Sequence, residues 1–270
     1  MRTKNNVSGL SVLAKISLLI IAAFTFWVLL HRAPRQEKDV YPYLLSISPN
    51  LVKICAQEIG TAKTVSWEDL LAVRSTLSEE NARPLIEQLQ KKIAFTELTS
   101  GTLSKQIMKD LQRHREILIR YPFLTPNKYR FPVVGKTWFE DSFGADREGG
   151  KRRHEGTDLF GAEGTPIINC RGGIIEQLGW NRLGGERVGI RGDDGNYYYY
   201  AHLQAISPKL VKGKRLETGE PIGSMGHTGD ALTTPDHLHF GIELPDGEWI
   251  DPYSFLAVWQ FWEESPVNRS

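Results

Sequence analysis

The stretch of sequence that decides the fold is GIIEQLGWNRLGGERVGIRGDDGNYYYYAHL, residues 173–203. It contains short runs of β-branched and aromatic residues, and Asp193-Asp194-Gly195-Asn196 provides a turn signal before the last run. Similar runs occupy residues 165–170 before it and 237–243 after it. Consecutive short strands without intervening helical patterns indicate an antiparallel sheet. We therefore expect an all-β domain in this half of the chain.

The N-terminus contains an apolar stretch, Gly9–Leu30, in which Lys15 is the one charged residue. A transmembrane helix needs roughly 20 apolar residues, and a lysine near its end can extend to the membrane interface. We therefore predict a single-pass anchor within residues 1–31. The alternative is a secretory signal peptide, whose apolar core has a similar length. Against this alternative, the nearest cleavage site would follow Ala33 and is succeeded by Pro34.

The next part of the chain is predicted to be a linker and then helices. Residues 32–44 are polar and contain two prolines, which indicates a linker. Residues 45–125 contain helix-start signals, such as Ser48-Pro49 and the capping-box-like Ser66, followed by apolar residues at helical spacing. This region has no glycine-rich loop, metal-ligand spacing or nucleophile motif. We expect it to be a spacer or to dock a partner protein.

Composition limits the classes of function. The 270 residues include 33 basic and 32 acidic side chains, and the net charge of +1 excludes a strongly basic nucleic-acid-binding protein. With 40% hydrophobic and 24% charged residues, the chain can form a globular core. The two cysteines, Cys55 and Cys170, are too few for a disulfide scaffold. We expect both to be small buried hydrophobic residues.

The motif HEGTD, residues 154–158, contains two potential metal ligands four positions apart. In an extended strand His154 and Asp158 would be roughly 13 Å apart, which is too far for both to bind one ion at about 2 Å. The neighbouring glycines disfavour a helix. We therefore predict a bend at Gly156 that directs both side chains to one point.

Two further motifs contain histidines on predicted strands. In HLHF, residues 237–240, His237 and His239 are two positions apart and share one face, so the apolar residues between and after them face the core. In the strand 197–203, the same alternation places Tyr198, Tyr200 and His202 on one face. Taken alone, either motif could be structural.

Together the three motifs predict a metal site. His154, Asp158 and one of His237 and His239 would supply three nitrogen or oxygen ligands. Three protein ligands leave a fourth position open for water, which is typical of catalytic zinc. The remaining histidines could then transfer protons and stabilise a developing negative charge.

Four motifs in this order resemble those of the LytM/lysostaphin-type zinc metallopeptidases, which cleave peptidoglycan cross-link peptides. They are HEGTD (154–158), YYYAHL (198–203), EPIGSMGHTG (220–229) and DHLHF (236–240). The resemblance covers roughly residues 128–256 and implies an antiparallel sheet with an open groove. It also implies that His154, Asp158 and His239 bind Zn²⁺, and that His202 and His237 are the catalytic pair.

The complete prediction is an α+β chain with an N-terminal transmembrane helix, a small helical region, the peptidase domain over 128–256 and a C-terminal tail over 257–270. The resemblance implies that the substrates are peptidoglycan stem peptides or cross-bridges. It also implies that the catalytic domain lies outside the cytoplasm, so that the apolar N-terminal stretch makes the chain a single-pass protein of the cell membrane whose helical region could bind a cell-wall protein.

The segment 231–236 departs from the glycine-containing run that the family usually has before its HxH pair, which leaves the bond specificity open. We predict that Asp236, next to His237, borders the substrate groove. Tyr200 is also predicted to line the groove, with packing within its strand as the alternative. Two other functions remain open, namely a non-catalytic LytM-fold scaffold or regulator of cell-wall enzymes, and a secreted wall-degrading toxin.

Overall fold

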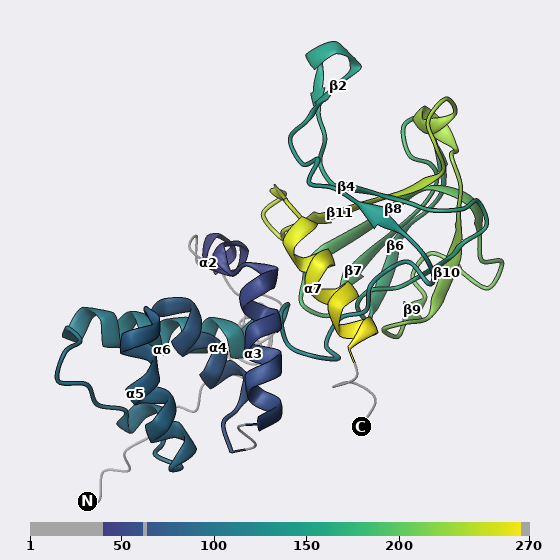
Figure 1. Ribbon diagram of the computed structural model, residues 1–270. Coiled ribbons are helices and arrows are strands. Elements are labelled where there is room, and N and C mark those ends of the chain that lie inside the picture. Colours follow the sequence, from purple (N-terminus) through teal and green to yellow (C-terminus); the bar gives the residue numbers. More distant parts are fainter. Residues whose placement is uncertain (1–39, 62–63, 266–270) are drawn as a thin grey trace, which may run out of the picture. The chain divides into compact units, whose positions relative to one another are not determined.

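A computed structural model describes residues 40–61 and 64–265, and Figure 1 shows helices first and strands after them along the chain. The helices that precede the strands are α2 (Val40–Ser46), α3 (Pro49–Thr61), α4 (Trp67–Thr76), α5 (Glu79–Gln90), the short 3₁₀ helix η1 (Phe95–Glu97) and α6 (Lys105–Arg120).

Serine caps explain where several of these helices begin. Ser48, Ser66 and Ser104 each accept a hydrogen bond from the backbone N–H three residues later, at 3.2, 3.1 and 3.2 Å. Such a bond satisfies one of the backbone donors that a helix start leaves unpaired. The helix starts predicted at Ser48-Pro49 and Ser66 are therefore confirmed.

The boundary between linker and helices differs from the prediction. The linker expected over residues 32–44 is helical from Val40 onward, because α2 begins there. Val40, Tyr41 and Leu44 are all buried, and their spacing places them on one helix face. Pro42 lies in the first turn of α2, where the backbone N–H has no helical partner and proline is tolerated.

The strands form one ten-stranded sheet and one small hairpin. The central strand order is β1-β4-β11-β8-β7-β6-β9, β10 pairs with β5 and β8, and every recorded pairing is antiparallel. The predicted antiparallel sheet is therefore confirmed. The strands of the large sheet are β1 (Trp138–Phe139), β4 (Thr157–Phe160), β5 (Pro166–Ile168), β6 (Gly173–Asn181), β7 (Gly185–Gly192), β8 (Tyr197–Ile206), β9 (Arg215–Leu216), β10 (Pro221–Met225), β11 (His237–Glu243) and β12 (Trp249–Ile250), and the hairpin consists of β2 (Asp146–Arg147) and β3 (Arg152–Arg153).

The last helix, α7 (Tyr253–Glu264), occupies residues for which we predicted a tail. Its apolar residues Phe255, Leu256, Trp259 and Trp262 recur at helical spacing, and all four are buried. Trp259 Nε1 donates a hydrogen bond to the Phe123 carbonyl at 2.8 Å. Residues 257–264 are thus part of the core, because an aromatic helix face must be covered.

The described residues, 40–61 and 64–265, belong to one compact unit. The Tyr41 hydroxyl in α2 donates to the side-chain oxygen of Asn196, the residue before β8, at 3.0 Å. Trp67 of α4 contacts Trp262 of α7 edge-on, with ring centroids 5.2 Å apart. Helix α2 therefore contacts the β domain directly, and α4 contacts α7. Both cysteines are buried and free, as predicted.

The predicted membrane anchor within residues 1–31 lies outside the described residues. Among the residues that are described, no helix has both the length and the apolar character needed to cross a membrane. The proposed anchor therefore rests on the sequence alone.

Candidate metal centre

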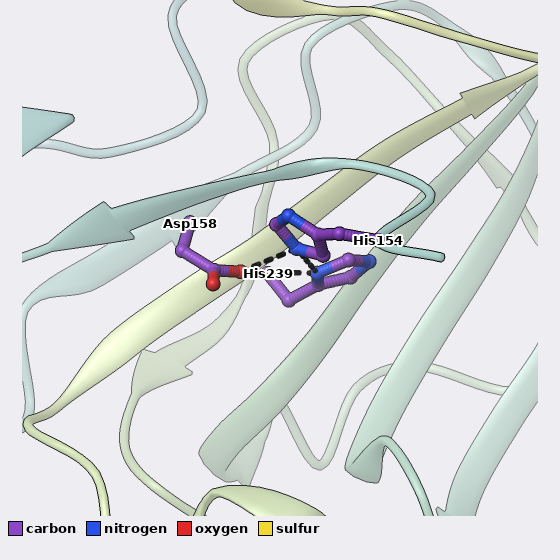
Figure 2. Close-up of side chains that lie close together, drawn as sticks. All are labelled: His154, Asp158 and His239. Atoms are coloured by element: carbon purple, nitrogen blue, oxygen red, sulfur yellow. Dashed lines mark hydrogen bonds and ion pairs between the residues drawn. The ribbon is translucent and has the colours of Figure 1, made fainter. Parts of the chain in front are cut away.

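Three side chains from two segments that are far apart in the sequence meet at strands β4 and β11 (Figure 2). Asp158 of β4 and His239 of β11 are direct cross-strand partners, and His154 reaches them from the segment before β4. His154 Nε2 lies 3.0 Å from Asp158 Oδ1 and 2.9 Å from His239 Nδ1, and the latter two atoms are 3.1 Å apart. Ligand atoms around a tetrahedral zinc are about 3.4 Å apart, so a metal ion would require shifts of a few tenths of an ångström.

Gly156 permits this convergence because no other residue would fit there. A Cβ atom at Gly156 would lie 2.5 Å from the Phe240 carbonyl oxygen and 2.7 Å from the His239 ring. The segment 154–156 can therefore pass closely over β11 and bring His154 toward Asp158. The sequence predicted a bend at this glycine, and the structural reason for the glycine is close approach to β11.

The orientation of His154 determines which of its nitrogens can bind a metal. Its Nδ1 lies 2.8 Å from the Ser142 carbonyl oxygen, which can only accept a hydrogen bond. Nδ1 therefore carries the proton, and in the neutral ring Nε2 presents its lone pair to Asp158 Oδ1. Two electron-pair donors 3.0 Å apart repel each other unless a cation, either a metal ion or a proton, lies between them. The donor set thus fits a metal ion.

The carboxylate of Asp158 is ionised. Burial acts to raise the pKa of Asp158, but the His154 and His239 side chains outweigh it and hold the pKa well below its usual range. The other oxygen, Oδ2, accepts a hydrogen bond from Arg147 Nη2 at 2.6 Å. Arg147 therefore fixes the carboxylate and leaves Oδ1 for the ligand cluster.

His202 joins this group through a β-bulge. Glu186 pairs with Leu203 and Val188 pairs with Tyr200, so Arg187 alone faces both Ala201 and His202. His202 has a φ of 62°, a left-handed conformation that bulges can require. Its Nδ1 lies 2.8 Å from the Thr228 carbonyl oxygen and donates a hydrogen bond to it. In the neutral ring Nδ1 therefore carries the proton, and Nε2 has a free lone pair. Burial lowers the pKa of His202 to about 3, and nearby His239 and His237 add to this effect.

His237 lies on the other side of the cluster. Its Nε2 is 3.9 Å from Asp158 Oδ1, and its Nδ1 lies 2.8 Å from the Pro235 carbonyl, to which it donates. The rings of His202 and His237 have centroids 4.9 Å apart. Both rings are therefore held by a backbone carbonyl at Nδ1. The apolar residues Leu238 and Phe240 face the core, as the alternation predicted.

The structure contradicts the prediction that Tyr200 lines the groove. Tyr200 is 0% exposed, and its hydroxyl binds the Cys170 N–H at 2.9 Å and Asn169 at 3.3 Å. The physical reason is the bulge, which moves His202 to the face of Tyr199 and breaks the simple alternation. The tyrosines in the groove are Tyr197 and Tyr199.

The predicted groove position of Asp236 is also wrong. Its side chain turns to His227, and its Oδ1 lies 2.7 Å from His227 Nδ1. The Pro235 carbonyl, and not Asp236, contacts His237. Strand alternation explains this arrangement, because Asp236 directly precedes His237 and adjacent residues point to opposite faces.

The cluster opens into a groove of about 710 Å³. All five residues that the sequence singled out for chemistry line it, namely His154, Asp158, His202, His237 and His239. The groove also contains arginines that sequence reasoning missed, among them Arg147 and Arg187. No spacing signal could have identified these arginines, because only the tertiary pairing brings them to the groove.

Comparison with known proteins assigns this domain. Residues 152–252 match peptidase family M23. The chain is 37% identical over 154 residues to an L-Ala–D-Glu endopeptidase of Bacillus subtilis, covering 53% of this chain and 47% of that protein. It is 38% identical over 90 residues to the peptidoglycan DD-endopeptidase ShyC of Vibrio cholerae, covering 33% of this chain and 20% of that protein. The chain thus spans less than half the length of these relatives.

Among solved structures, the catalytic domain of lysostaphin from Staphylococcus simulans is 30% identical, with a TM-score of 0.40, and the match covers 44% of this chain and 92% of that one. The described domain thus combines an antiparallel sheet with a His/Asp/His cluster that fits a metal ion. Residues 152–252 belong to peptidase family M23, the LytM/lysostaphin family.

Proposed function

We propose that this protein is a membrane-anchored zinc endopeptidase that hydrolyses peptide bonds in bacterial peptidoglycan. One observation carries the proposal: His154 Nε2, Asp158 Oδ1 and His239 Nδ1 converge on one point inside a groove that also contains His202 and His237. Zinc is the metal that suits two imidazoles and a carboxylate with an open fourth position. When bound, zinc would lower the pKa of water and polarise a peptide carbonyl.

The chain's own residues would handle the protons. His202 and His237 each donate Nδ1–H to a backbone carbonyl, at Thr228 and Pro235, so Nε2 is the atom that can accept or donate a proton. Since burial lowers the pKa of His202, this ring is neutral at physiological pH. We propose that the pair shares the general-base, general-acid and oxyanion-stabilising roles during hydrolysis.

The substrate class is supported by the relatives. The matching proteins of B. subtilis and V. cholerae are named as an L-Ala–D-Glu endopeptidase and a peptidoglycan DD-endopeptidase. The first name specifies the bond between L-alanine and D-glutamate, and the second specifies peptidoglycan. We propose the same polymer as substrate here, and we extend the proposal to location because peptidoglycan lies outside the cytoplasm. The apolar stretch Gly9–Leu30 would anchor the protein with its catalytic domain on that side.

Incubation with purified sacculi tests this function. The protein would be stripped of metal with a chelator, divided, and reloaded with zinc or left metal-free, and the released fragments would be identified by mass spectrometry. We expect zinc-dependent release of soluble peptides with new amino termini. Full hydrolysis by the exhaustively chelated protein would refute the zinc mechanism, and no hydrolysis by the zinc-loaded protein would favour a scaffold or regulatory role.

A further inference from the structure

The groove contains several arginines, and all but one have a carboxylate partner within the described part of the chain. Arg147, Arg152, Arg153 and Arg191 pair with Asp158, Asp230, Asp146 and Glu176, respectively. Arg187 forms no such ion pair there, and its one hydrogen bond runs from Nη1 to Gln177 Oε1 at 3.2 Å. Its Nε is buried and has no hydrogen-bond partner. Arg187 therefore brings an uncompensated positive charge to the groove.

Strand pairing places Arg187 in line, across neighbouring strands, with two residues of the metal cluster, Asp158 and His239. Asp158 faces His239, His239 faces Ala201, and Ala201 faces Arg187 across the bulge. Adjacent strands are about 4.8 Å apart, so the backbone of Arg187 lies about 10 Å from that of His239. Successive residues of an extended peptide are about 3.3 Å apart. A peptide held at the cluster would thus present a residue within about three positions of the scissile bond to the guanidinium.

The surroundings of Arg187 favour an anionic ligand on this side. Tyr197 and Tyr199 line the same part of the groove, and the positive charge of Arg187 opposes the rise in their pKa values that burial causes. Two groove carboxylates have no ion pair among the described residues, Glu155 and Glu243, and both lie toward β4 and β11. The charge of the groove therefore changes sign across the sheet, from acidic near β11 to basic at β7.

We propose that Arg187 binds a carboxylate of the substrate, on a residue within about three positions of the scissile bond, and so makes the enzyme selective for acidic peptides. This inference rests on the proposed function, which it deepens by naming a recognised group and the residue that binds it. Peptidoglycan peptides can supply this group as the free α-carboxylate of D-glutamate, the residue in the name of the B. subtilis relative. A guanidinium can bind both oxygens of a carboxylate, but a carboxamide offers one acceptor and no charge.

The test compares two soluble stem peptides that differ in one group, the free α-carboxylate of D-glutamate or its carboxamide. A hydrogen bond to a charged group corresponds to roughly 10- to 100-fold in rate or affinity. We therefore expect zinc-loaded wild-type protein to hydrolyse the acid with a kcat/KM about 10- to 100-fold above that for the amide. In Arg187→Gln this ratio should fall to about 1, chiefly through loss of activity toward the acid.

Arg191→Gln is the matched control, because Arg191 lies on the same strand and in the same groove but pairs with Glu176. We expect this variant to keep the preference for the acid. Zinc content, measured for all three proteins, should be equal, which separates substrate recognition from damage to the metal centre. Equal rates for acid and amide in the wild type, or an unchanged preference in Arg187→Gln, would overturn the inference.

Parallel digestion of sacculi separates the inference from the function on which it rests. If sacculi are hydrolysed but acid and amide are equivalent, the role of Arg187 is wrong and the endopeptidase function stands. If sacculi are not hydrolysed, the proposed function fails, and calorimetric binding of the two peptides decides the role of Arg187. Tighter binding of the acid, lost in Arg187→Gln, would support it, and equal binding would overturn it.

Discussion

At the scale of single residues, backbone carbonyls decide what the histidines can do. Ser142, Pro235 and Thr228 each accept a hydrogen bond from the Nδ1–H of a groove histidine, so Nε2 is the nitrogen of each ring that is left to bind a metal ion or exchange a proton. His239 differs, because its Nδ1 is the atom that points to His154 and Asp158. Fixing the tautomer in this way increases the basicity of a metal ligand and orients a proton-transfer group.

Removing one ligand should therefore prevent metal binding. We expect His239→Ala to weaken zinc binding by more than about 100-fold, because even the loss of a residue that only orients a ligand costs 10- to 100-fold. His154→Ala and Asp158→Ala should behave in the same way. Competition with a chromogenic chelator measures the affinity, and His114→Ala is the control because His114 of α6 belongs to no group of potential metal ligands in the described residues. Zinc affinity equal to wild type in His239→Ala would contradict the ligand assignment.

If His202 and His237 are the catalytic pair, substituting one of them should reduce turnover without reducing zinc binding. His237→Ala should retain zinc and lose turnover, with kcat reduced by about 10²- to 10⁴-fold, the usual contribution of a general acid or base. Metal analysis and steady-state kinetics on the same preparation check both parts. A variant that loses zinc together with activity would instead identify His237 as a ligand.

The buried His202 predicts a dependence of stability on pH. Its pKa of about 3 in the folded protein is below the value of about 6.5 in an unfolded chain. Between these values the unfolded chain binds one more proton, so the free energy of unfolding falls as the pH falls, by at most about 1.4 kcal/mol per pH unit. In metal-free protein, His202→Gln should show a smaller fall between pH 6.5 and 5, measured by urea denaturation. Identical slopes in variant and wild type would disprove this assignment.

At the scale of elements, the sequence could predict the strands but not the bulge between β7 and β8. Alternating residues in 237–243 give the correct faces, because β11 is regular and His239 has a direct partner on either side. In 197–203 the same rule assigns Tyr200 to the wrong face. The bulge depends on pairing with Arg187 of another strand and on the Thr228 carbonyl, and neither is visible in the local pattern.

The crossing of the 154–156 segment over β11 provides a test at this scale. Gly156→Ala would place a methyl group against the Phe240 carbonyl and the His239 ring, so it should destabilise the fold by about 1–3 kcal/mol and weaken zinc binding. Urea denaturation and the chelator competition measure the two effects. Gly101→Ala is the control, since nothing lies within 4 Å of a Cβ there. A Gly156→Ala protein with wild-type zinc affinity would show that the close approach is not needed.

At the scale of the whole molecule, the helical region and the sheet belong to one compact unit. The sequence could identify α3 and α4 from their capping residues, because those signals are local. It could not predict that Tyr41 would bond to Asn196, or that Trp67 would contact Trp262 of α7, because such contacts depend on long-range packing. The helices therefore contribute to the core and not to a separate spacer.

This packing predicts that the helices and the sheet unfold together. Trp67→Ala removes an aromatic contact with α7, and we expect a loss of about 2 kcal/mol, less than the 3–5 kcal/mol of a fully buried tryptophan. For a unit of this size, the midpoint of thermal unfolding should fall by about 4–8 °C. Circular dichroism at 222 nm follows the helices, and hydrogen exchange of β8 and β11 amides follows the sheet. Both should shift by the same free energy in Trp67→Ala and by almost none in Trp180→Ala, whose side chain is 62% exposed. A shift confined to the helices would mean that the sheet domain is stable without them, because a substitution in α4 can destabilise β11 only through the contacts between the two regions.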